Sequence, residues 1–213
     1  RMAKRINRHL NQRSEMLSGI SHDLRTPLTR LKLQLEMLSQ KDISRQMSKD
    51  IDEMEKMLHD YLQFAKNQTQ EKVIKINLAN LLEEIKQNFL GKNLEIKSQD
   101  EIIFRGRYLA LKRSFENIIQ NGLVYGSNVM VNVQKSSNLI FIIFEDDGPG
   151  IPEEDYKNVF KPFFRLDKSR SLNNSGVGLG LTIVEDIINS HGGSVSFAKS
   201  KLKGLSVKIS LPF

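Results

Sequence analysis

The sequence predicts two parts of different fold class, an α-helical hairpin followed by an α+β two-layer sandwich. Two observations predict them. Leucines recur at spacings of three and four residues between Leu17 and Leu38, which is typical of a helix that packs along a seam. After about residues 68–71 the pattern changes to short alternating apolar runs separated by polar residues and glycine. A chain of 213 residues has room for both parts.

The apolar residues of the first part form two heptad rows. One row holds Leu17, Leu24, Leu31 and Leu38, and the other holds Leu28 and Leu35. After the polar residues 40–42, the pattern resumes at Met47, Ile51, Met54, Leu58, Tyr61 and Ala65. Because a lone hairpin has too little surface to bury both stripes, we expect two copies to form a dimeric four-helix bundle.

The second part mixes strand and helix patterns. Strands are expected over residues 73–76, 94–96, 102–104, 129–133, 139–144, 195–197 and 205–211, and helices over residues 78–89, 108–124 and 179–191. Asn77 is the expected N-cap of the first helix. Together these elements predict helices on one face of a mostly antiparallel sheet. The long polar segment 151–175 is expected to form a lid.

Composition limits the class of protein. Hydrophobic residues make up 39% of the chain and charged residues 27%, which is ordinary for a soluble globular protein. No apolar run is long enough for a membrane span, and the absence of cysteine excludes disulfides and thiolate metal sites. The net charge of +7 is scattered among acidic residues, so we expect no nucleic-acid partner. Because the chain begins inside a helical pattern, it is expected to be part of a longer protein.

His22 lies one position off the apolar seam, so its ring is expected to face solvent. A single histidine on a helix surface usually has no catalytic role, but the neighbours of His22 favour one. Asp23 can accept the ring proton, and Thr26 lies on the same helical face. Pro27 predicts a bend in the helix just after the histidine. Together these residues suggest a nucleophilic imidazole.

Asn117 and Asn121 are four residues apart and therefore share one face of an expected helix. Their neutral amide oxygens suit a Mg²⁺ ion that keeps several waters and is bound mainly by phosphates. The alternative for this pair is an ordinary solvated helix face.

Two glycine-rich segments predict a nucleotide site. Asp146 ends an expected strand, where its carboxylate can accept from an exocyclic amine such as that of adenine, and Gly148 and Gly150 let the chain turn there. The second segment opens an expected helix, whose N-terminal amides favour phosphate, and its glycines are Gly176, Gly178 and Gly180. The alternatives are a surface turn for the first segment and a flexible loop for the second.

Three phenylalanines, Phe160, Phe163 and Phe164, surround Pro162 in the otherwise polar lid segment. We expect them to anchor the lid to the core, as a gated nucleotide pocket requires.

Taken in order, these motifs resemble the catalytic core of two-component sensor histidine kinases. Residues 21–28 resemble the phosphoacceptor box, 117–121 the N box, 146–150 the first glycine box, 160–164 the F box and 176–180 the second glycine box. The phosphoacceptor box is most similar to that of the EnvZ-like group. The resemblance implies the tail of a HAMP-like linker over residues 1–13, a dimerisation and histidine phosphotransfer domain over 14–67, and a GHKL-type (Bergerat) ATP-binding domain over 72–213.

The resemblance also implies an activity. His22 would be phosphorylated from ATP, with Asp23 as general base, and would pass the phosphoryl group to an aspartate of an OmpR-like response regulator receiver domain. Thr26 would assist dephosphorylation of that regulator. The protein would act as a homodimer whose membrane-spanning sensor region lies upstream, so this chain would be the cytoplasmic portion of an inner-membrane protein.

The resemblance implies roles at the nucleotide as well. Asn117 and Asn121 would hold Mg²⁺ beside the phosphates, Asp146 would bind the adenine amine, and Tyr125 would lie against the base. The other implied contacts to the nucleotide are Gly148, Gly150, Phe164, Gly176, Gly178 and Gly180.

Two positions depart from the family pattern. Val177 stands where a hydroxyl residue is common, and Gly122 replaces the usual alanine after Asn121, which is expected to add backbone freedom beside the metal site. Two alternatives remain open. An ATP-driven clamp of the gyrase/Hsp90 type resembles the second part alone and has a possible catalytic glutamate in Glu116. A non-catalytic scaffold that senses ATP is the other.

Overall fold

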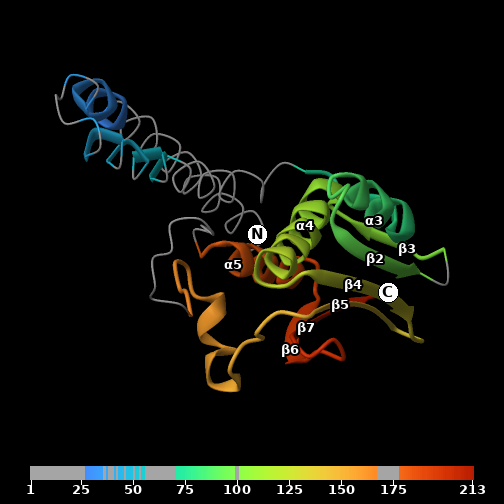
Figure 1. Ribbon diagram of the computed structural model, residues 1–213. Coiled ribbons are helices and arrows are strands. Elements are labelled where there is room, and N and C mark those ends of the chain that lie inside the picture. The colour runs from blue at the N-terminus through green and yellow to red at the C-terminus, as the bar shows by residue number, and fades with distance from the viewer. Residues whose placement is uncertain are drawn as a thin grey trace. The chain divides into compact units, whose positions relative to one another are not determined.

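The computed structural model describes residues 27–35, 37, 41, 43–45, 47–49, 51–52, 54–55, 71–98, 101–166 and 178–213. The chain divides into two compact units, unit 1 (Arg1–Gln70) and unit 2 (Glu71–Phe213). All the strands described belong to unit 2 (Figure 1). Among the described residues, no helix combines the length and the hydrophobicity that a membrane span requires.

In unit 1 the described residues are helical over 27–35 and at most positions from 41 to 55. Leu28, Leu35 and Ile51 form a buried cluster between these two stretches. Lys32 adds ion pairs across them, at 2.6 Å to Asp52 and 2.8 Å to Glu55. Leu31, from the other predicted heptad row, is 47% exposed. Its row partners Leu17, Leu24 and Leu38 lie outside the described residues.

The described strands of unit 2 form two sheets. The main sheet has the order β2 (Asn93–Ser98), β4 (Asn128–Lys135), β5 (Leu139–Asp146), β7 (Leu205–Pro212) and β6 (Ser194–Lys199). Within it, β2 and β4 run parallel and the other pairs run antiparallel, which confirms the predicted mostly antiparallel sheet. A separate antiparallel pair joins β1 (Ile74–Asn77) to β3 (Ile103–Gly106). This division into two sheets was not predicted from the sequence.

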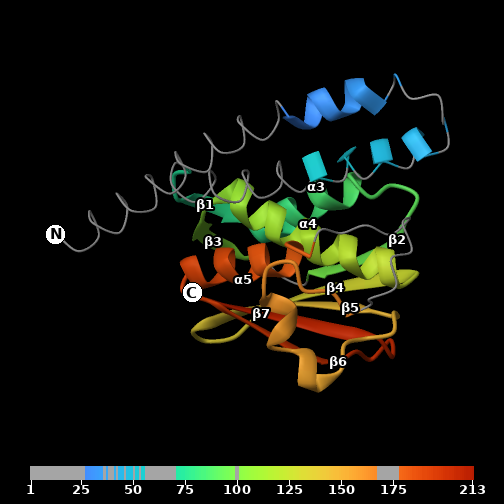
Figure 2. The same ribbon diagram turned by 90° about the vertical axis from the view of Figure 1, so that its left-hand side faces the viewer.

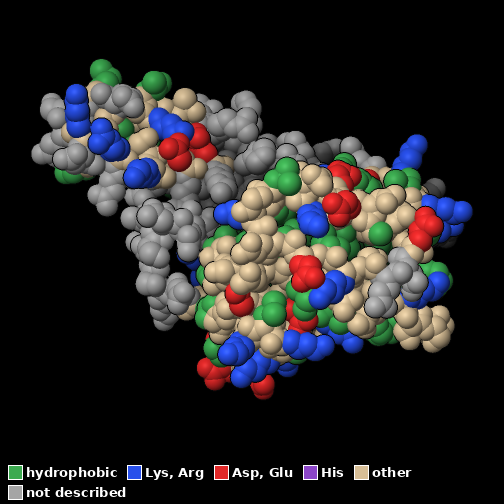
Figure 3. Space-filling view, turned by 45° about the vertical axis from the view of Figure 1, so that its right-hand side comes forward, with side chains coloured by type: hydrophobic (Ala, Val, Ile, Leu, Met, Phe, Trp, Pro, Cys, Tyr) green, Lys and Arg blue, Asp and Glu red, His purple; other side chains and the backbone are tan. Residues whose placement is uncertain are grey.

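Three described helices, α3 (Leu78–Gln87), α4 (Tyr108–Tyr125) and α5 (Gly180–Ser190), cover one face of the main sheet (Figure 2). Their apolar sides pack on the strands, as in the tilted contact between Phe115 of α4 and Phe144 of β5, whose ring centroids are 5.7 Å apart. The predicted N-cap of α3 is confirmed, because the Asn77 side chain accepts from the N–H groups of Ala79 and Asn80. On the surface in Figure 3, basic and acidic side chains are interspersed.

The C-terminal end of α5 is joined to the start of α4 through one imidazole. Nε2 of His191 accepts from the backbone N–H of Arg107 at 3.0 Å, so Nδ1 carries the proton and donates to the carbonyl of Ile187 at 2.7 Å. Burial lowers the pKa of His191 despite the partial raising by the bond to Ile187 and the charge of Glu71, and the nearby charge of Arg107 lowers it further. The two effects that lower it favour the neutral ring that this contact requires.

We therefore expect the stability of unit 2 to depend on the protonation of His191. Since the folded pKa lies below the unfolded value, the contribution is complete above about pH 6.5 and declines as the pH falls from there through the folded pKa. In His191→Gln, which can accept a hydrogen bond but cannot titrate, that part of the decline should disappear. Urea unfolding of both proteins between about pH 5 and 8 measures it. Identical pH dependence in the two proteins would contradict the assignment.

Candidate functional site

Helix α4 places its two asparagines beside the start of α5. Nδ2 of Asn117 lies 3.4 Å from the carbonyl oxygen of Gly180, to which it donates. A Cβ atom added to Gly180 would lie 3.7 Å from Nδ2 of Asn121 and 3.9 Å from Cγ of Asn117. The N box and the last glycine of the second glycine box therefore come together in the fold.

The start of α5 is suited to an anion. Among the described residues, no side chain caps this helix and no acidic residue lies in its first turn. The chain reaches it through Gly178, whose φ of +76° is one that glycine adopts without strain. A Cβ at Gly178 would also lie 2.9 Å from the carbonyl oxygen of Phe164. Both observations explain why glycine is required at this position.

Asp146 ends β5 with one carboxylate oxygen held in place. Its Oδ1 accepts from the backbone N–H of Gly148 at 2.9 Å and of Leu205 at 3.0 Å. Its Oδ2 lies on the side of Gly122, 3.8 Å from the position of a Cβ there. Burial raises the pKa of Asp146, although the two N–H donors lower it in part. One oxygen is thus fixed by the backbone, and Oδ2 accepts no hydrogen bond from the described residues.

Gly122 allows close packing of α4, and the added backbone freedom expected from the sequence stays a prediction. A Cβ there would lie 2.6 Å from Cγ2 of Val129 and 3.3 Å from Cβ of Asp146. Gly122 is buried in α4. The missing side chain therefore lets α4 approach the ends of β4 and β5.

Two groups of residues around Asp146 were missed from the sequence. The first is the β6–β7 turn. The backbone N–H of Gly204 donates to the carbonyl of Asp146 at 3.1 Å, and the backbone N–H of Lys201 donates to the buried carboxylate of Glu145 at 3.0 Å. A Cβ at Gly204 would lie 2.3 Å from Oδ1 of Asp146. No pattern in the sequence points to these contacts, because they are made by backbone amides more than 50 residues from Glu145 and Asp146.

The second missed group is Asp147, which holds the connection between α4 and β4. Its carboxylate accepts from the N–H groups of Ser127 and Asn128, at 2.7 and 2.9 Å, and from Nδ2 of Asn128. These bonds, those from Asn128 above all, lower the pKa of Asp147. The sequence motif contained this residue, but its half-buried position and its neighbours could not be inferred from spacing.

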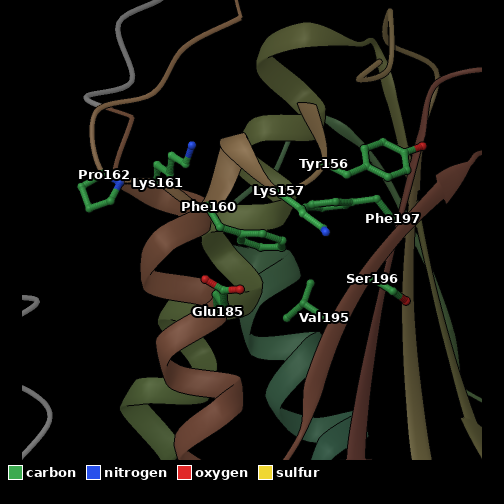
Figure 4. A pocket seen from close by; sticks show the side chains of 9 residues that line it. All are labelled: Tyr156, Lys157, Phe160, Lys161, Pro162, Glu185, Val195, Ser196 and Phe197. Carbon is green, nitrogen blue, oxygen red and sulfur yellow. The ribbon is translucent and has the colours of Figure 1, made fainter. Parts of the chain in front are cut away.

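The F box is attached to the core by one of its phenylalanines. Phe160 stacks on Phe197 of β6, with 4.9 Å between ring centroids, and its carbonyl accepts from the hydroxyl of Thr182 on α5. A pocket of about 570 Å³ lies beside this stack, between residues 156–162, α5 and β6, and Figure 4 shows the side chains that line it. The predicted anchoring is confirmed for Phe160.

The other two phenylalanines behave differently. Phe163 is 58% exposed, so the predicted anchoring is wrong for its side chain. Its backbone N–H nevertheless donates to the carbonyl of Gly178 at 3.0 Å, joining the two ends of segment 164–177. Phe164 is half-buried, and its carbonyl faces Gly178.

The remaining site residues are placed as follows. Tyr125 ends α4 and is 53% exposed, and its carbonyl lies 3.1 Å from the position of a Cβ on Gly148. Gly150 has a φ of +74°. Residues His22, Asp23, Thr26, Gly176 and Val177 lie outside the described part of the chain.

The side chains present suit a metal ion that takes most of its ligands from bound phosphates and water. Within the described residues, no three His, Asp or Glu side chains gather as a metal cluster. The carbonyl oxygens of Asn117 and Asn121 accept no hydrogen bond from the described residues, so both are available as neutral ligands. This donor set fits Mg²⁺ coordinated by phosphates and water.

Two family models match the chain. The model of the His Kinase A (phospho-acceptor) domain matches residues 12–70. The model described as histidine kinase-, DNA gyrase B-, and HSP90-like ATPase matches residues 106–213.

Similar proteins are sensor kinases. The sensor histidine kinase GtrS of Pseudomonas aeruginosa is 37% identical over 213 residues, covering 99% of this chain and 44% of GtrS. Sensor protein RstB of Escherichia coli K12 is 34% identical over 227 residues, covering 99% of this chain and 51% of RstB. The crystal structure of full-length ShkA in complex with AMPPNP matches with a TM-score of 0.69 at 19% identity, covering 94% of this chain and 46% of ShkA.

The chain spans about half the length of the curated relatives it matches. The likeness to ShkA, at its low identity, concerns the fold alone. The ATPase model by itself covers half of the chain, and the phospho-acceptor model precedes it. The chain therefore belongs to the sensor histidine kinases, with a phospho-acceptor domain followed by an ATPase domain of the GHKL type.

Proposed function

We propose that this chain transfers the γ-phosphoryl group of ATP to His22 and then to an aspartate of a response regulator. The observation that carries the proposal is the carboxylate of Asp146, which has one oxygen fixed by two backbone N–H groups and the other on the side of α4. The phospho-acceptor model, which matches residues 12–70, contains His22 and supports its role.

At the base, Oδ2 of Asp146 accepts from the exocyclic amine of adenine. Guanine presents a carbonyl at the same position, so its oxygen would face a carboxylate oxygen and bind poorly. Tyr125 lies against the base, and Gly148 and Gly150 shape the adjoining turn. The AMPPNP bound to ShkA, which shares the fold, agrees with ATP as the nucleotide.

At the phosphates, the start of α5 supplies backbone amides from Gly178 and Gly180. Asn117 and Asn121 would hold Mg²⁺ through their amide oxygens, and Gly176 and Phe164 would be further contacts to the nucleotide. When bound, Mg²⁺ neutralises charge on the phosphate oxygens during transfer.

At the acceptor, a ring nitrogen of neutral His22 attacks the γ-phosphorus. A P–N bond forms, the bond from the γ-phosphorus to the β–γ bridging oxygen breaks, and ADP leaves. Asp23 takes the ring proton as general base. When the chain acts as a phosphatase, Thr26 positions the water that dephosphorylates the regulator.

The organisation of the whole protein is part of the proposal. Residues 1–13 end a HAMP-like linker, 14–67 form the phosphotransfer domain and 72–213 the ATP-binding domain. The exposed apolar residues of unit 1, which include Leu31, Leu33 and Met37, support pairing with a second copy. The regulator is OmpR-like, and a membrane-spanning sensor region precedes this cytoplasmic portion.

The decisive test is incubation of the chain with γ-labelled ATP and Mg²⁺. We expect a label that is lost in acid, survives alkali and is absent from His22→Ala. His9→Ala, which removes another histidine of unit 1, serves as the matched control and should keep the label.

The two rival functions predict other results. Steady ATP hydrolysis without a label on the protein would indicate a clamp of the gyrase/Hsp90 type. Glu116, the candidate glutamate for that chemistry, accepts a hydrogen bond from Asn88 at the C-cap of α3 at 2.9 Å. Nucleotide binding with neither hydrolysis nor label would indicate a sensing scaffold.

A further inference from the structure

The first turn of α4 takes its capping groups from outside the helix. Arg107 at the N-cap position makes no side-chain capping bond, and the first turn has no acidic residue. Instead, the carboxylate of Glu71 accepts from the N–H of Leu109 at 2.5 Å and of Ala110 at 3.0 Å. Two of the amides that a helix start leaves without partners are thus satisfied by a side chain 38 and 39 residues upstream.

Glu71 is the first residue of unit 2, so it stands where the chain arrives from unit 1. Its two hydrogen bonds are made to the helix that carries Asn117 and Asn121. A carboxylate suits this position, because it also complements the positive end of the helix dipole. The side chain of Glu71 therefore connects the first residue of unit 2 to a helix of the proposed nucleotide site.

Helix α5 is connected to α4 at both of its own ends, once at the start of α4 and once near the middle of α4. The N–H of Arg107 donates to His191 at one end, and Asn117 donates to the carbonyl of Gly180 at the other. We therefore expect a displacement at Glu71 to be passed to α5 as well as to the first half of α4.

We propose that Glu71 is a positioning residue, which couples the segment joining the two units to the α4–α5 pair so that the nucleotide site follows the end of unit 1. This inference rests on the proposed function, since it concerns how the γ-phosphate of bound ATP is brought to His22. Glu71 touches neither ATP nor His22 in this scheme. Its loss should therefore slow phosphorylation and leave ATP affinity nearly unchanged.

The alternative is that Glu71 only stabilises the helix start. The two roles can be separated, because Arg107 has the extended backbone (φ −89°, ψ 113°) that an N-cap serine adopts. In the double variant Glu71→Ala, Arg107→Ser, a local hydroxyl caps the helix, but nothing ties it to the incoming chain. Arg107→Ser alone shows the effect of the new cap. Glu101→Gln, an exposed carboxylate bonded to the side chain of Asn77, is the matched control.

The experiment uses the whole chain and three measurements: amide hydrogen exchange at Leu109 and Ala110, the ATP dissociation constant, and the rate of autophosphorylation. In Glu71→Ala we expect exchange about tenfold faster, ATP affinity within about twofold of the original, and a rate lower by about fivefold or more. In the double variant the exchange protection should return while the rate stays low. Glu101→Gln should leave all three unchanged.

Recovery of the rate in the double variant would show that Glu71 acts only as a cap and would overturn the inference. So would unchanged exchange in Glu71→Ala, or a loss of ATP affinity that matches the loss of rate. If the unmodified chain binds ATP but is never phosphorylated, the proposed function fails instead. The exchange measurement would still report whether Glu71 holds α4.

Discussion

Replacing Gly204 with alanine is expected to weaken ATP binding by about thirtyfold to a hundredfold. The new Cβ would lie 2.3 Å from Oδ1 of Asp146 and 2.5 Å from both the carbonyl oxygen of Asp146 and the nitrogen of Gly148. Because two of these atoms are backbone, the β6–β7 turn must move away and lose its hydrogen bonds to Asp146, a cost of about 2–3 kcal/mol. Calorimetric titration with ATP measures the loss of affinity.

Gly91→Ala is the matched control for this substitution. Gly91 also lies in a turn, with a φ of +80°, but nothing stands within 4 Å of the added Cβ. We expect backbone strain of about 1 kcal/mol in the free energy of unfolding and no change in ATP affinity. Unchanged ATP binding by Gly204→Ala would show that the β6–β7 turn does not position Asp146.

Replacing Asp146 with asparagine should weaken ATP binding by about tenfold to a hundredfold and reduce the preference for ATP over GTP. In the proposed function the carboxylate would accept from the adenine amine as a charged group, and such a hydrogen bond contributes about 1.5–3 kcal/mol. The amide can instead donate to the carbonyl of guanine. Competition between ATP and GTP for the site measures the change in preference.

The same residue predicts how binding depends on pH. Burial raises the pKa of Asp146, and the ionised form is the better acceptor. As the pH falls through that raised pKa, ATP affinity of the unmodified chain should therefore fall, whereas the affinity of Asp146→Asn should lack this component. Asp147→Asn, which changes the neighbouring half-buried carboxylate, is the control and should keep the preference for ATP. An unaltered preference in Asp146→Asn would contradict the role of Asp146 at the base.

The element types of unit 2 could be predicted because they depend on local spacing. Alternating valines predicted β4, a continuous apolar run predicted β5, and the two strands are observed to pair antiparallel. Asn77 was identified as a cap because its effect reaches only to Ala79 and Asn80. The parallel pairing of β2 with β4 could not be predicted in this way, because α4 and β3 lie between them in the sequence.

The candidate site was likewise predicted only in part from the sequence. Asn117, Asn121 and Asp146 were selected by residue type and spacing, and the fold places the two asparagines beside the start of α5. Phe163 was expected to be buried with the other aromatics, but its left-handed backbone (φ 65°) accompanies an exposed ring. No local pattern encodes that conformation.

Residue types at short, fixed intervals were enough to predict the candidate chemical groups, most helices and strands, and the family. How those groups are held could be seen only in the folded chain. Oδ1 of Asp146 is held by the N–H of Leu205, the start of α4 by Glu71, and Gly122 lies against Val129. The first two contacts use backbone amides, which every residue but proline possesses, and the third depends on the space left by a missing side chain. The sequence contains no pattern that predicts such contacts, so they could be found only in the folded structure.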